Sequence, residues 1–241
     1  ADTLAAFPQV TRQHIYDALK EMTAKEPRYY TAEILQGQDT VLKPQAVVSK
    51  MKDILPPETL LFVDVGNCLC WAGQFYEARQ PGTVFCATNV ASMGYAIAAS
   101  IGGKIAAPTR PVVALLGDSA FGMNGMEIHT AADYKLPVIW VALNNGGHGM
   151  VYHGEKSLSG KSYLSLYRIP LDISSIARSL GILSFRVQNL REFEDSLRQA
   201  LERQVPCVID ALVDLEEIPR SLQKRVNTLS AFFGDEKGQN M

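Results

Sequence analysis

Short apolar runs alternate with amphipathic segments through the middle of the chain, between residues 44 and 213. The runs that we assign to strands lie at 60–65, 112–116, 138–143, 185–187 and 207–213. The segments between them predict helices at 45–55, 70–76, 93–107, 126–134, 172–180 and 190–203. Runs that are apolar throughout are typical of strands whose two faces are both covered. The pattern therefore predicts an α/β fold, a doubly wound parallel sheet flanked by helices.

The segments on either side of this region are too short to be domains of their own. Residues 1–43 predict one leader helix at 10–24, followed by a polar linker. Residues 214–241 predict a C-terminal tail with one short helix at 220–233. Asp172 precedes two serines and is a candidate N-cap for the helix at 172–180. We therefore expect one domain, residues 44–213, with a short extension at each end.

The composition fits a globular domain and excludes several classes of partner. Hydrophobic residues make up 47% of the 241 residues, which is enough for a substantial core. The net charge of −2 gives no electrostatic reason to expect nucleic acid or an anionic membrane as a partner. No apolar stretch is long enough to span a bilayer, and the four cysteines contain no C-x-x-C pair. We expect free thiols and a cytoplasmic location.

Two oxygen-bearing side chains follow neighbouring strands of the predicted sheet. Asp118 comes directly after one apolar run, and Asn145 follows the next run 27 positions later. Both would lie at the carboxyl ends of adjacent parallel strands, where ligands bind in such sheets. Mg²⁺ prefers octahedral oxygen ligands and usually takes one or two protein groups together with phosphate oxygens and water. The pair therefore predicts a site for a divalent cation with a diphosphate.

The residues beside this pair support the same interpretation. Ser119 and Ala120 would place backbone N–H groups near a helix start, facing a diphosphate. The glycines at 146–147 let the chain turn and offer a carbonyl oxygen to the cation. A turn would explain either half of the motif alone. Their joint spacing, each half directly after a predicted strand, favours a ligand site over coincidence.

The motif resembles the metal–diphosphate motif of thiamine-diphosphate enzymes, which reads Gly-Asp-Gly, a fixed gap, then Asn-Asn. Residues 44–213 as a whole are similar to the C-terminal cofactor domain of the acetohydroxyacid synthase branch of the pyruvate-decarboxylase-like superfamily. The stretches that carry the similarity are 64–66, 71–76, 92–95, 117–131, 136–137 and 143–151. The stretch 117–127 also looks like oxalyl-CoA decarboxylase and 2-hydroxyacyl-CoA lyase sequences.

The resemblance implies a thiamine-diphosphate-binding fold and a set of contacts to the cofactor. Mg²⁺ would be held by the Asp118 carboxylate, the Asn145 amide oxygen and the Gly147 carbonyl. Met93 would be the apolar wedge that bends the cofactor for catalysis, and the Ala91 carbonyl would accept from its 4′-amino group. An ordinary core position is the alternative for Met93. The further contacts implied are Val65, Gly66, Asn67, Cys68, Gly117, Ser119, Ala120, Gly149, Met150 and Val151. The chain departs from the family at 67–69, with Asn-Cys-Leu in place of Gln-His-Gln.

Two histidines follow the second half of the motif. His148 and His153 lie where we expect a substrate-side loop, at 146–170, and either could donate a hydrogen bond to a carboxylate or act as an acid–base catalyst. The alternative is that both are solvated loop residues. Lys156, Lys161 and Arg168 make the same loop basic, so it would attract an anionic substrate or simply face solvent.

The resemblance also implies what a second chain would supply. In the family, a glutamate of a pyrimidine-binding domain activates the cofactor, and residues 1–43 are too short to be that domain. We therefore expect a split enzyme with a separate pyrimidine-domain subunit, assembled as a heterotetramer, a dimer of heterodimers. The activity implied is decarboxylation of a small 2-oxo acid that ends in protonation or in carboligation.

Three other functions stay open at this point. An acyl-CoA-type lyase, like oxalyl-CoA decarboxylase, would need a partner domain that binds CoA. A non-catalytic regulatory homologue would keep the fold without turnover, although the intact Asp118, Asn145 and Met93 argue against it. An ordinary Rossmann dehydrogenase is disfavoured because no Gly-x-Gly-x-x-Gly opens a helix after the first strand. Against a standard acetohydroxyacid synthase, Gly154 stands where that family has a substrate-channel tryptophan.

Overall fold

The computed structural model describes residues 12–25 and 41–234 of the chain. The chain divides into two compact units, residues 1–33 and 34–241, and each is described by itself. In the first unit, the helix α2 (Arg12–Lys25) confirms the helix expected at 10–24, of which residues 10 and 11 lie outside the described residues. The Gln13 side chain of α2 donates a hydrogen bond to the Asp17 carboxylate one turn later, at 2.9 Å.

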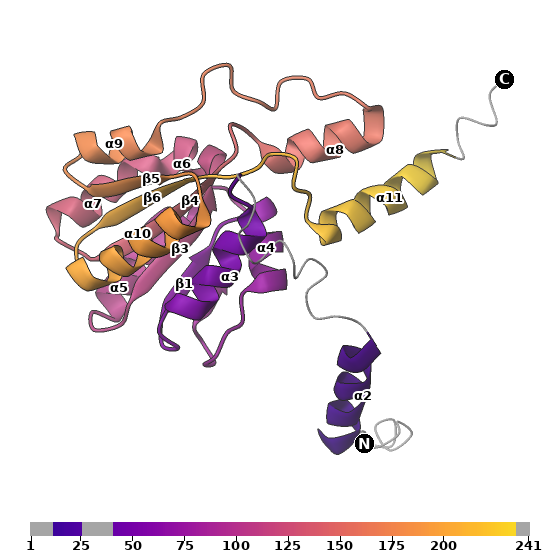
Figure 1. The fold of residues 1–241 in the computed structure, drawn as a ribbon, viewed down its shortest axis with the longest axis horizontal. Coiled ribbons are helices and arrows are strands. Elements are labelled where there is room, and N and C mark those ends of the chain that lie inside the picture. The colour runs from indigo at the N-terminus through magenta and orange to yellow at the C-terminus, as the bar shows by residue number, and fades with distance from the viewer. Residues whose placement is uncertain (1–11, 26–40, 235–241) are drawn as a thin grey trace. The chain divides into compact units, whose positions relative to one another are not determined.

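The second unit is built around a six-stranded parallel sheet (Figure 1). Its strands are β1 (Leu60–Val63), β2 (Val84–Cys86), β3 (Val112–Gly117), β4 (Val138–Asn144), β5 (Leu183–Val187) and β6 (Cys207–Leu212). Their order across the sheet is β2-β1-β3-β4-β6-β5, and every neighbouring pair is parallel. The doubly wound parallel sheet predicted from the sequence is therefore confirmed.

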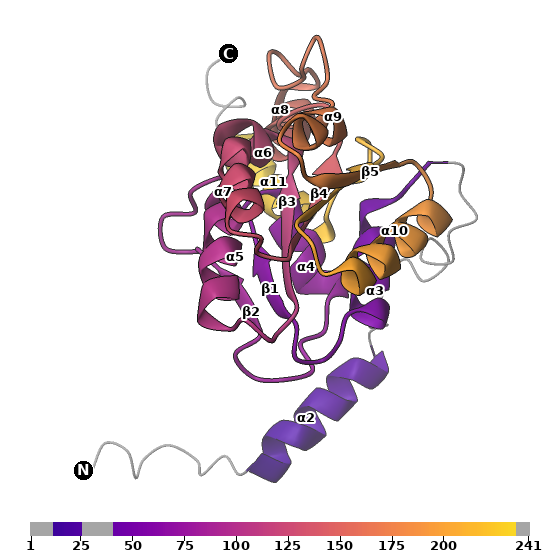
Figure 2. The ribbon, with the colours of Figure 1, turned by 90° about the vertical axis from the view of Figure 1, so that its left-hand side faces the viewer.

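Helices cover both faces of this sheet, as Figure 2 shows for α5 and α7 on one side and α3 and α10 on the other. The helices of the second unit are α3 (Pro44–Ile54), α4 (Asn67–Phe75), α5 (Tyr95–Ala106), α6 (Asp118–Asn124), α7 (Ile128–Asp133), α8 (Gly149–Ser159), α9 (Ile173–Ser179), α10 (Leu190–Arg203) and α11 (Arg220–Gly234), with a 3₁₀ turn, η2 (Gly125–Glu127). Alternate strand residues such as Ala114 and Trp140 pack with α5, α7 and α9 in one core. The intervening residues, such as Val113, face α3, α4 and α10 and are equally buried. Burial on both faces explains why β3 and β4 are apolar almost throughout.

The chain reverses its direction along the sheet between β1 and β3. From β1 it moves outward to the edge strand β2, and it then passes back beyond β1 to β3 and β4. The helix after β1, α4, packs with α3, whereas α6, which follows β3, packs through Phe121 into the core of the opposite face. Segments that leave two neighbouring strands toward opposite faces open a crevice at the carboxyl edge, the usual ligand site of such sheets.

The structure contains three elements that the sequence pattern does not predict, namely β2, α6 and α8. The helix expected at 126–134 is a 3₁₀ turn followed by the shorter α7. The expectation of a loop at 146–170 is wrong in its first half, where the chain forms α8, and this error matters more for the site. The N-cap prediction is confirmed, since the Asp172 carboxylate accepts a hydrogen bond from the Ser175 N–H at 2.9 Å.

The structure agrees with the sequence on the cysteines, and its helices can be compared with the span of a membrane. All four cysteines lie within residues 41–234, and each is a free thiol, as expected. No helix in the described ranges, 12–25 and 41–234, combines the length and the apolarity needed to cross a membrane.

Candidate cofactor site

A cavity of about 500 Å³ opens at the carboxyl edge of the sheet, at the crevice between the segments that follow β1 and β3. Its walls come from the segments that follow β1, β2, β3, β4 and β6, which are far apart in the sequence. Every residue that the sequence analysis assigned to the cofactor lines this one cavity. They are Val65, Gly66, Asn67, Cys68, Ala91, Met93, Gly117, Asp118, Ser119, Ala120, Asn145, Gly147, Gly149, Met150 and Val151. The parallel topology therefore brings the two halves of the motif together.

Asp118 ties the end of β3 to the loop that follows β4. Its carboxylate is 1% exposed, and one oxygen accepts hydrogen bonds from the N–H groups of Gly146 (2.9 Å) and Gly147 (2.8 Å). The other oxygen accepts from the Ser119 N–H at 2.8 Å. Burial raises the pKa of Asp118 to about 6, although these N–H donors oppose the shift. An anionic ligand for a cation is thus buried beside the 145–148 loop.

Asn145 contributes an oxygen that the protein leaves unpaired. Its side-chain Oδ1 is buried and has no hydrogen-bond partner within the described residues. A buried acceptor without a partner is unfavourable and calls for a missing donor or cation. The Gly147 carbonyl beside it accepts from the Gly149 N–H at 3.0 Å and retains a second lone pair. A carboxylate, an amide oxygen and a carbonyl form the hard oxygen set that fits Mg²⁺.

No cluster of three or more histidine, cysteine, aspartate or glutamate residues suited to a metal occurs in the described part of the chain. A zinc or iron site of the usual kind therefore has no set of ligands there. The oxygen set around Asp118 and Asn145 fits a cation that keeps some of its ligands from phosphate and water.

The 145–148 loop is held from its outer side by residues 165–167. The N–H of His148 donates to the Ser165 carbonyl at 2.7 Å, and the N–H of Tyr167 donates to the Gly146 carbonyl at 2.9 Å. Only glycine fits at 147, because a Cβ there would lie 2.4 Å from the Ser165 carbonyl oxygen. The Tyr167 hydroxyl also donates to Ser119 Oγ at 3.0 Å, so it joins both halves of the motif. Neither role is visible in the sequence.

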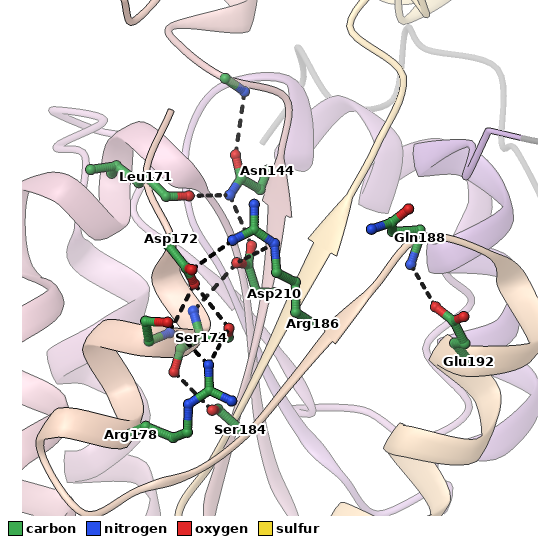
Figure 3. A network of polar contacts seen from close by, with 12 residues as sticks. Asn144, Leu171, Asp172, Ser174, Arg178, Ser184, Arg186, Gln188, Glu192 and Asp210 are labelled. Atoms are coloured by element: carbon green, nitrogen blue, oxygen red, sulfur yellow. Dashed lines mark hydrogen bonds and ion pairs between the residues drawn. The ribbon is translucent and has the colours of Figure 1, made fainter. Parts of the chain in front are cut away.

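A buried polar network anchors the same loop from inside (Figure 3). The Asn144 amide donates to the Leu171 carbonyl and to Asp210 Oδ1, both at 2.9 Å, and its oxygen accepts from the Gly146 N–H at 3.3 Å. Asp210 is fully buried on β6, and it also accepts from the N–H of Ser174 at the start of α9. The residue immediately before Asn145 is thereby fixed to two neighbouring elements.

Met93 lines the cavity from the segment between β2 and α5, and a buried aspartate holds that segment. Asp64 is 0% exposed and accepts from the N–H groups of Gly94 (3.0 Å) and Ala96 (2.8 Å). Gly94 has a left-handed backbone with φ of 86°, and a Cβ there would lie 2.8 Å from the Asn124 side chain. From the sequence, Asp64 is recognisable only as part of a stretch that matches the family. The structure shows that it positions the Met93 segment.

The family profile described as "Thiamine pyrophosphate enzyme, C-terminal TPP binding domain" matches residues 64–211. The chain belongs to this family. Thiamine pyrophosphate and thiamine diphosphate are the same compound, so the resemblance stated from the motif is confirmed. The six-stranded sheet and the cavity at its carboxyl edge are therefore those of a thiamine-diphosphate-binding domain.

Several curated proteins are similar to this thiamine-diphosphate-binding chain. A putative acetolactate synthase large subunit of Mycobacterium tuberculosis is 32% identical over 183 residues, which cover 75% of the chain and 33% of the relative. A probable acetolactate synthase large subunit of Methanococcus aeolicus is 27% identical over 187 residues, covering 75% and 31%. A putative thiamine pyrophosphate-containing protein of Bacillus subtilis is 28% identical over 177 residues, covering 73% and 31%. The chain thus spans about a third of the length of these relatives.

The residues at 67–69, where the chain departs from the family's usual sequence, occupy the start of α4. Gly66, with φ of 100°, precedes this helix, and only glycine adopts that backbone without strain. The Cys68 thiol donates to the carbonyls of Asp64 (3.1 Å) and Val65 (3.2 Å), and burial raises its pKa. Cys68 is therefore a neutral thiol in this thiamine-diphosphate domain, whereas the side-chain oxygen of Asn67 has no hydrogen-bond partner among the residues that the structure describes.

The two candidate histidines lie in different environments. His148 lines the cavity, and its ring meets Tyr167 edge-on with the ring centroids 5.7 Å apart. His153 lies within α8 instead of a solvated loop, is 1% exposed, and is not among the residues lining the cavity of the described domain. Burial lowers the pKa of His153. Of the two, only His148 is placed where it could contact a bound substrate.

Proposed function

We propose that this chain is the diphosphate-binding half of a thiamine-diphosphate- and Mg²⁺-dependent enzyme that acts on a small 2-oxo acid, by decarboxylation or by carboligation. The observation that carries the proposal is the unpaired oxygen of Asn145, buried on the same cavity as the Asp118 carboxylate. The family and the acetolactate synthase large subunits among the relatives support the reaction class.

The chain's own residues have three tasks in this proposal. Asp118, Asn145 and the Gly147 carbonyl bind Mg²⁺, and the start of α6 receives the diphosphate. Met93, which lines the cavity, would supply an apolar surface against the cofactor. His148 hydrogen-bonds an anionic group of the substrate. When bound, thiamine diphosphate supplies the electron sink for the carbanion left by loss of CO₂.

A second domain completes the site in this proposal, and we assign it to a separate pyrimidine-domain chain in a dimer of heterodimers. Apolar side chains beside the cavity support a covering partner. Val90, next to Ala91, is 85% exposed, and Val151 lines the cavity while 51% exposed. Single exposed apolar residues are common on protein surfaces. Two such residues beside the same cavity are consistent with an interface to another protein. Turnover of a 2-oxo acid by the chain with Mg²⁺ and cofactor, without any second polypeptide, would reject the partner.

Calorimetric titration with thiamine diphosphate, with and without Mg²⁺, tests the cofactor assignment. We expect Asp118→Asn to weaken Mg²⁺-dependent binding by about 10–100-fold, because a charged ligand is replaced by a neutral one of the same shape. Asp133→Asn is the matched control, since Asp133 is exposed at the end of α7 and should leave binding unchanged. Equal affinity in Asp118→Asn and the wild type, with both proteins folded by circular dichroism, would contradict the assignment.

A further inference from the structure

Both ring nitrogens of the buried His153 side chain make hydrogen bonds, and the bond at Nε2 determines whether Nδ1 donates or accepts. Its Nε2 lies 2.6 Å from the Leu215 carbonyl oxygen, and a carbonyl can only accept a hydrogen bond. Nε2 therefore carries a proton. Because the ring is 1% exposed and burial lowers its pKa, it is neutral, which leaves Nδ1 as a lone-pair acceptor.

This tautomer fixes the orientation of Asn67 at the start of α4. The Asn67 side chain lies 3.0 Å from His153 Nδ1, and an acceptor at Nδ1 requires the amide NH₂ on that side. The donor chain thus runs from Asn67 to His153 and from His153 to the Leu215 carbonyl. The carboxamide cannot rotate by half a turn without placing its oxygen against a nitrogen lone pair.

The oxygen of the same carboxamide has nothing to bind. Asn67 Oδ1 is buried without a hydrogen-bond partner among residues 12–25 and 41–234, and Asn67 lines the cavity. Native proteins seldom leave a buried acceptor unpaired, so the missing partner belongs to a ligand. An amide oxygen accepts from a hydroxyl or an amine, whereas it repels a carboxylate or phosphate oxygen. This wall of the cavity is therefore suited to a hydrogen-bond donor such as a hydroxyl or an amino group.

We propose that Asn67 is the acceptor in this cavity for a hydroxyl or amino group of the bound ligand, and that His153 is the positioning residue that holds the carboxamide in the accepting orientation. The orientation stands on this chain's contacts alone, whereas the nature of the ligand rests on the proposed function. Two sources of the donor share this chemistry, the amino group of the cofactor's pyrimidine and a hydroxyl on the substrate side.

The tautomer of His153 can be read without any cofactor. In ¹⁵N NMR spectra of the histidine-labelled chain, we expect a neutral ring with the proton on Nε2. Asn67→Leu, which keeps the volume and removes the amide, should shift the Nδ1 resonance and leave the Nε2 resonance in place. A proton on Nδ1 of wild-type His153 would overturn the proposal, because Asn67 would then present its NH₂ to the cavity.

Binding measurements identify the donor that Asn67 accepts. The probes are Mg²⁺ with thiamine diphosphate, and Mg²⁺ with oxythiamine diphosphate, in which an oxygen replaces the pyrimidine amino group. If the cofactor is the source, Asn67→Leu weakens thiamine diphosphate binding about 3–10-fold and leaves oxythiamine diphosphate binding unchanged. If the substrate is the source, both cofactors bind as before, and the loaded protein loses about the same factor in affinity for lactate but not for pyruvate.

Variants of His153 test its positioning role separately. His153→Phe removes the acceptor that faces the Asn67 NH₂, so we expect a loss of affinity in the same direction as Asn67→Leu. His153→Gln can present an amide oxygen to that NH₂ and should restore binding. Asn227→Leu, at an exposed position of α11, is the control for the substitution itself. Circular dichroism verifies that each variant is folded.

The outcomes separate this proposal from the proposed function. If wild-type protein, with its partner domain present, binds neither cofactor, the proposed function fails and the ligand class assigned to Asn67 fails with it. If the wild type binds the cofactor and Asn67→Leu changes no affinity, or changes all of them equally, the acceptor role of Asn67 is overturned while the proposed function stands.

Discussion

In the absence of a cation, Asp118 binds a proton more tightly than an exposed aspartate does. Its desolvation outweighs the three N–H groups that donate to it, so the pKa rises from 3.8 to about 6. A bound Mg²⁺ would supply the positive charge that this site lacks. In the proposed site, the Asp118 carboxylate, whose ionised form is unfavourable without a cation, would therefore provide much of the affinity for Mg²⁺.

The stability of the cation-free protein should consequently depend on pH through Asp118. The folded protein binds this proton more tightly than the unfolded chain does, so the stabilisation is complete below about pH 4 and is lost as pH rises through about 6. We expect the free energy of unfolding in EDTA to fall between pH 5 and 7.5 by more in the wild type than in Asp118→Asn. The difference is about 1–1.5 kcal/mol.

Urea unfolding at the two pH values measures this difference, with Asp133→Asn as the control that keeps the wild-type dependence. The same pH dependence in wild type and Asp118→Asn would show that Asp118 titrates normally. Adding saturating Mg²⁺ and thiamine diphosphate should reverse the sign, because the ligands bind the deprotonated carboxylate and therefore stabilise the protein more at pH 7.5.

At the scale of elements, the 145–148 loop is fixed by neighbours on both sides. Residues 165–167 bind its backbone from outside, and the Asn144–Asp210 pair holds it from inside (Figure 3). Both supports are backbone or buried polar contacts that tolerate little displacement. A change that moves this loop should therefore affect the proposed cation site even when Asp118 and Asn145 are intact.

Two glycines on either side of the start of α8 provide a matched comparison. Gly147→Ala places a Cβ 2.4 Å from the Ser165 carbonyl oxygen, so we expect it to destabilise the protein by about 1–3 kcal/mol and to weaken Mg²⁺-dependent cofactor binding. Gly154→Ala lies inside α8 with open space around the new methyl, so it should stabilise by about 0.5–1 kcal/mol. Thermal unfolding and calorimetry on both variants measure these effects. Similar changes in both would contradict the close packing at Gly147.

The elements predicted from the sequence carry local signals, whereas the elements that were missed depend on long-range contacts. β3 and β4 are buried on both faces, so their apolar runs reveal them, and Asp172 marks the start of α9 by its own side chain. β2 has three residues, all exposed at the sheet edge, and carries no periodic signal. α8 contains Gly149 and Gly154 and depends on distant contacts, such as that from the Tyr152 hydroxyl to Glu216 at 2.8 Å.

The candidate site was more predictable than its supports. Asp118 and Asn145 could be placed together because the carboxyl ends of parallel strands share one edge. Asp64, Tyr167 and Asp210 act through contacts with residues 30 to 66 positions away, and no local pattern indicates such pairs. The sequence pattern carries no signal for α8 and so predicts a loop around His153, and only the folded structure brings His153 to Asn67.

At the scale of the whole domain, the cavity lies where the strand order reverses, and exposed apolar side chains lie beside it. Val90 is 85% exposed on the segment between β2 and α5, and it makes no contribution to the core. A partner domain that covers the cavity would bury such a residue at its interface. In the proposed assembly, Val90 would therefore lie at the interface, on the side of the cavity.

We expect Val90→Ser to weaken association with the proposed pyrimidine-domain partner by about tenfold, because an apolar contact that the proposed interface would bury is replaced by a polar group. The stability of the chain alone should change by less than about 0.5 kcal/mol. Ile105→Ser is the control, since Ile105 is 63% exposed at the far end of α5, toward the amino edge of the sheet. Analytical ultracentrifugation measures association, and equal effects of the two substitutions would argue against an interface at Val90.

The central claim is that Asp118, Asn145 and the Gly147 carbonyl hold a divalent cation at a bound diphosphate. Anomalous diffraction from crystals grown with thiamine diphosphate and Mn²⁺ in place of Mg²⁺ tests it most directly. We expect one anomalous peak about 2.0–2.3 Å from an oxygen of each of these residues. Cofactor bound with its cation on other residues, or with no cation at all, would contradict it.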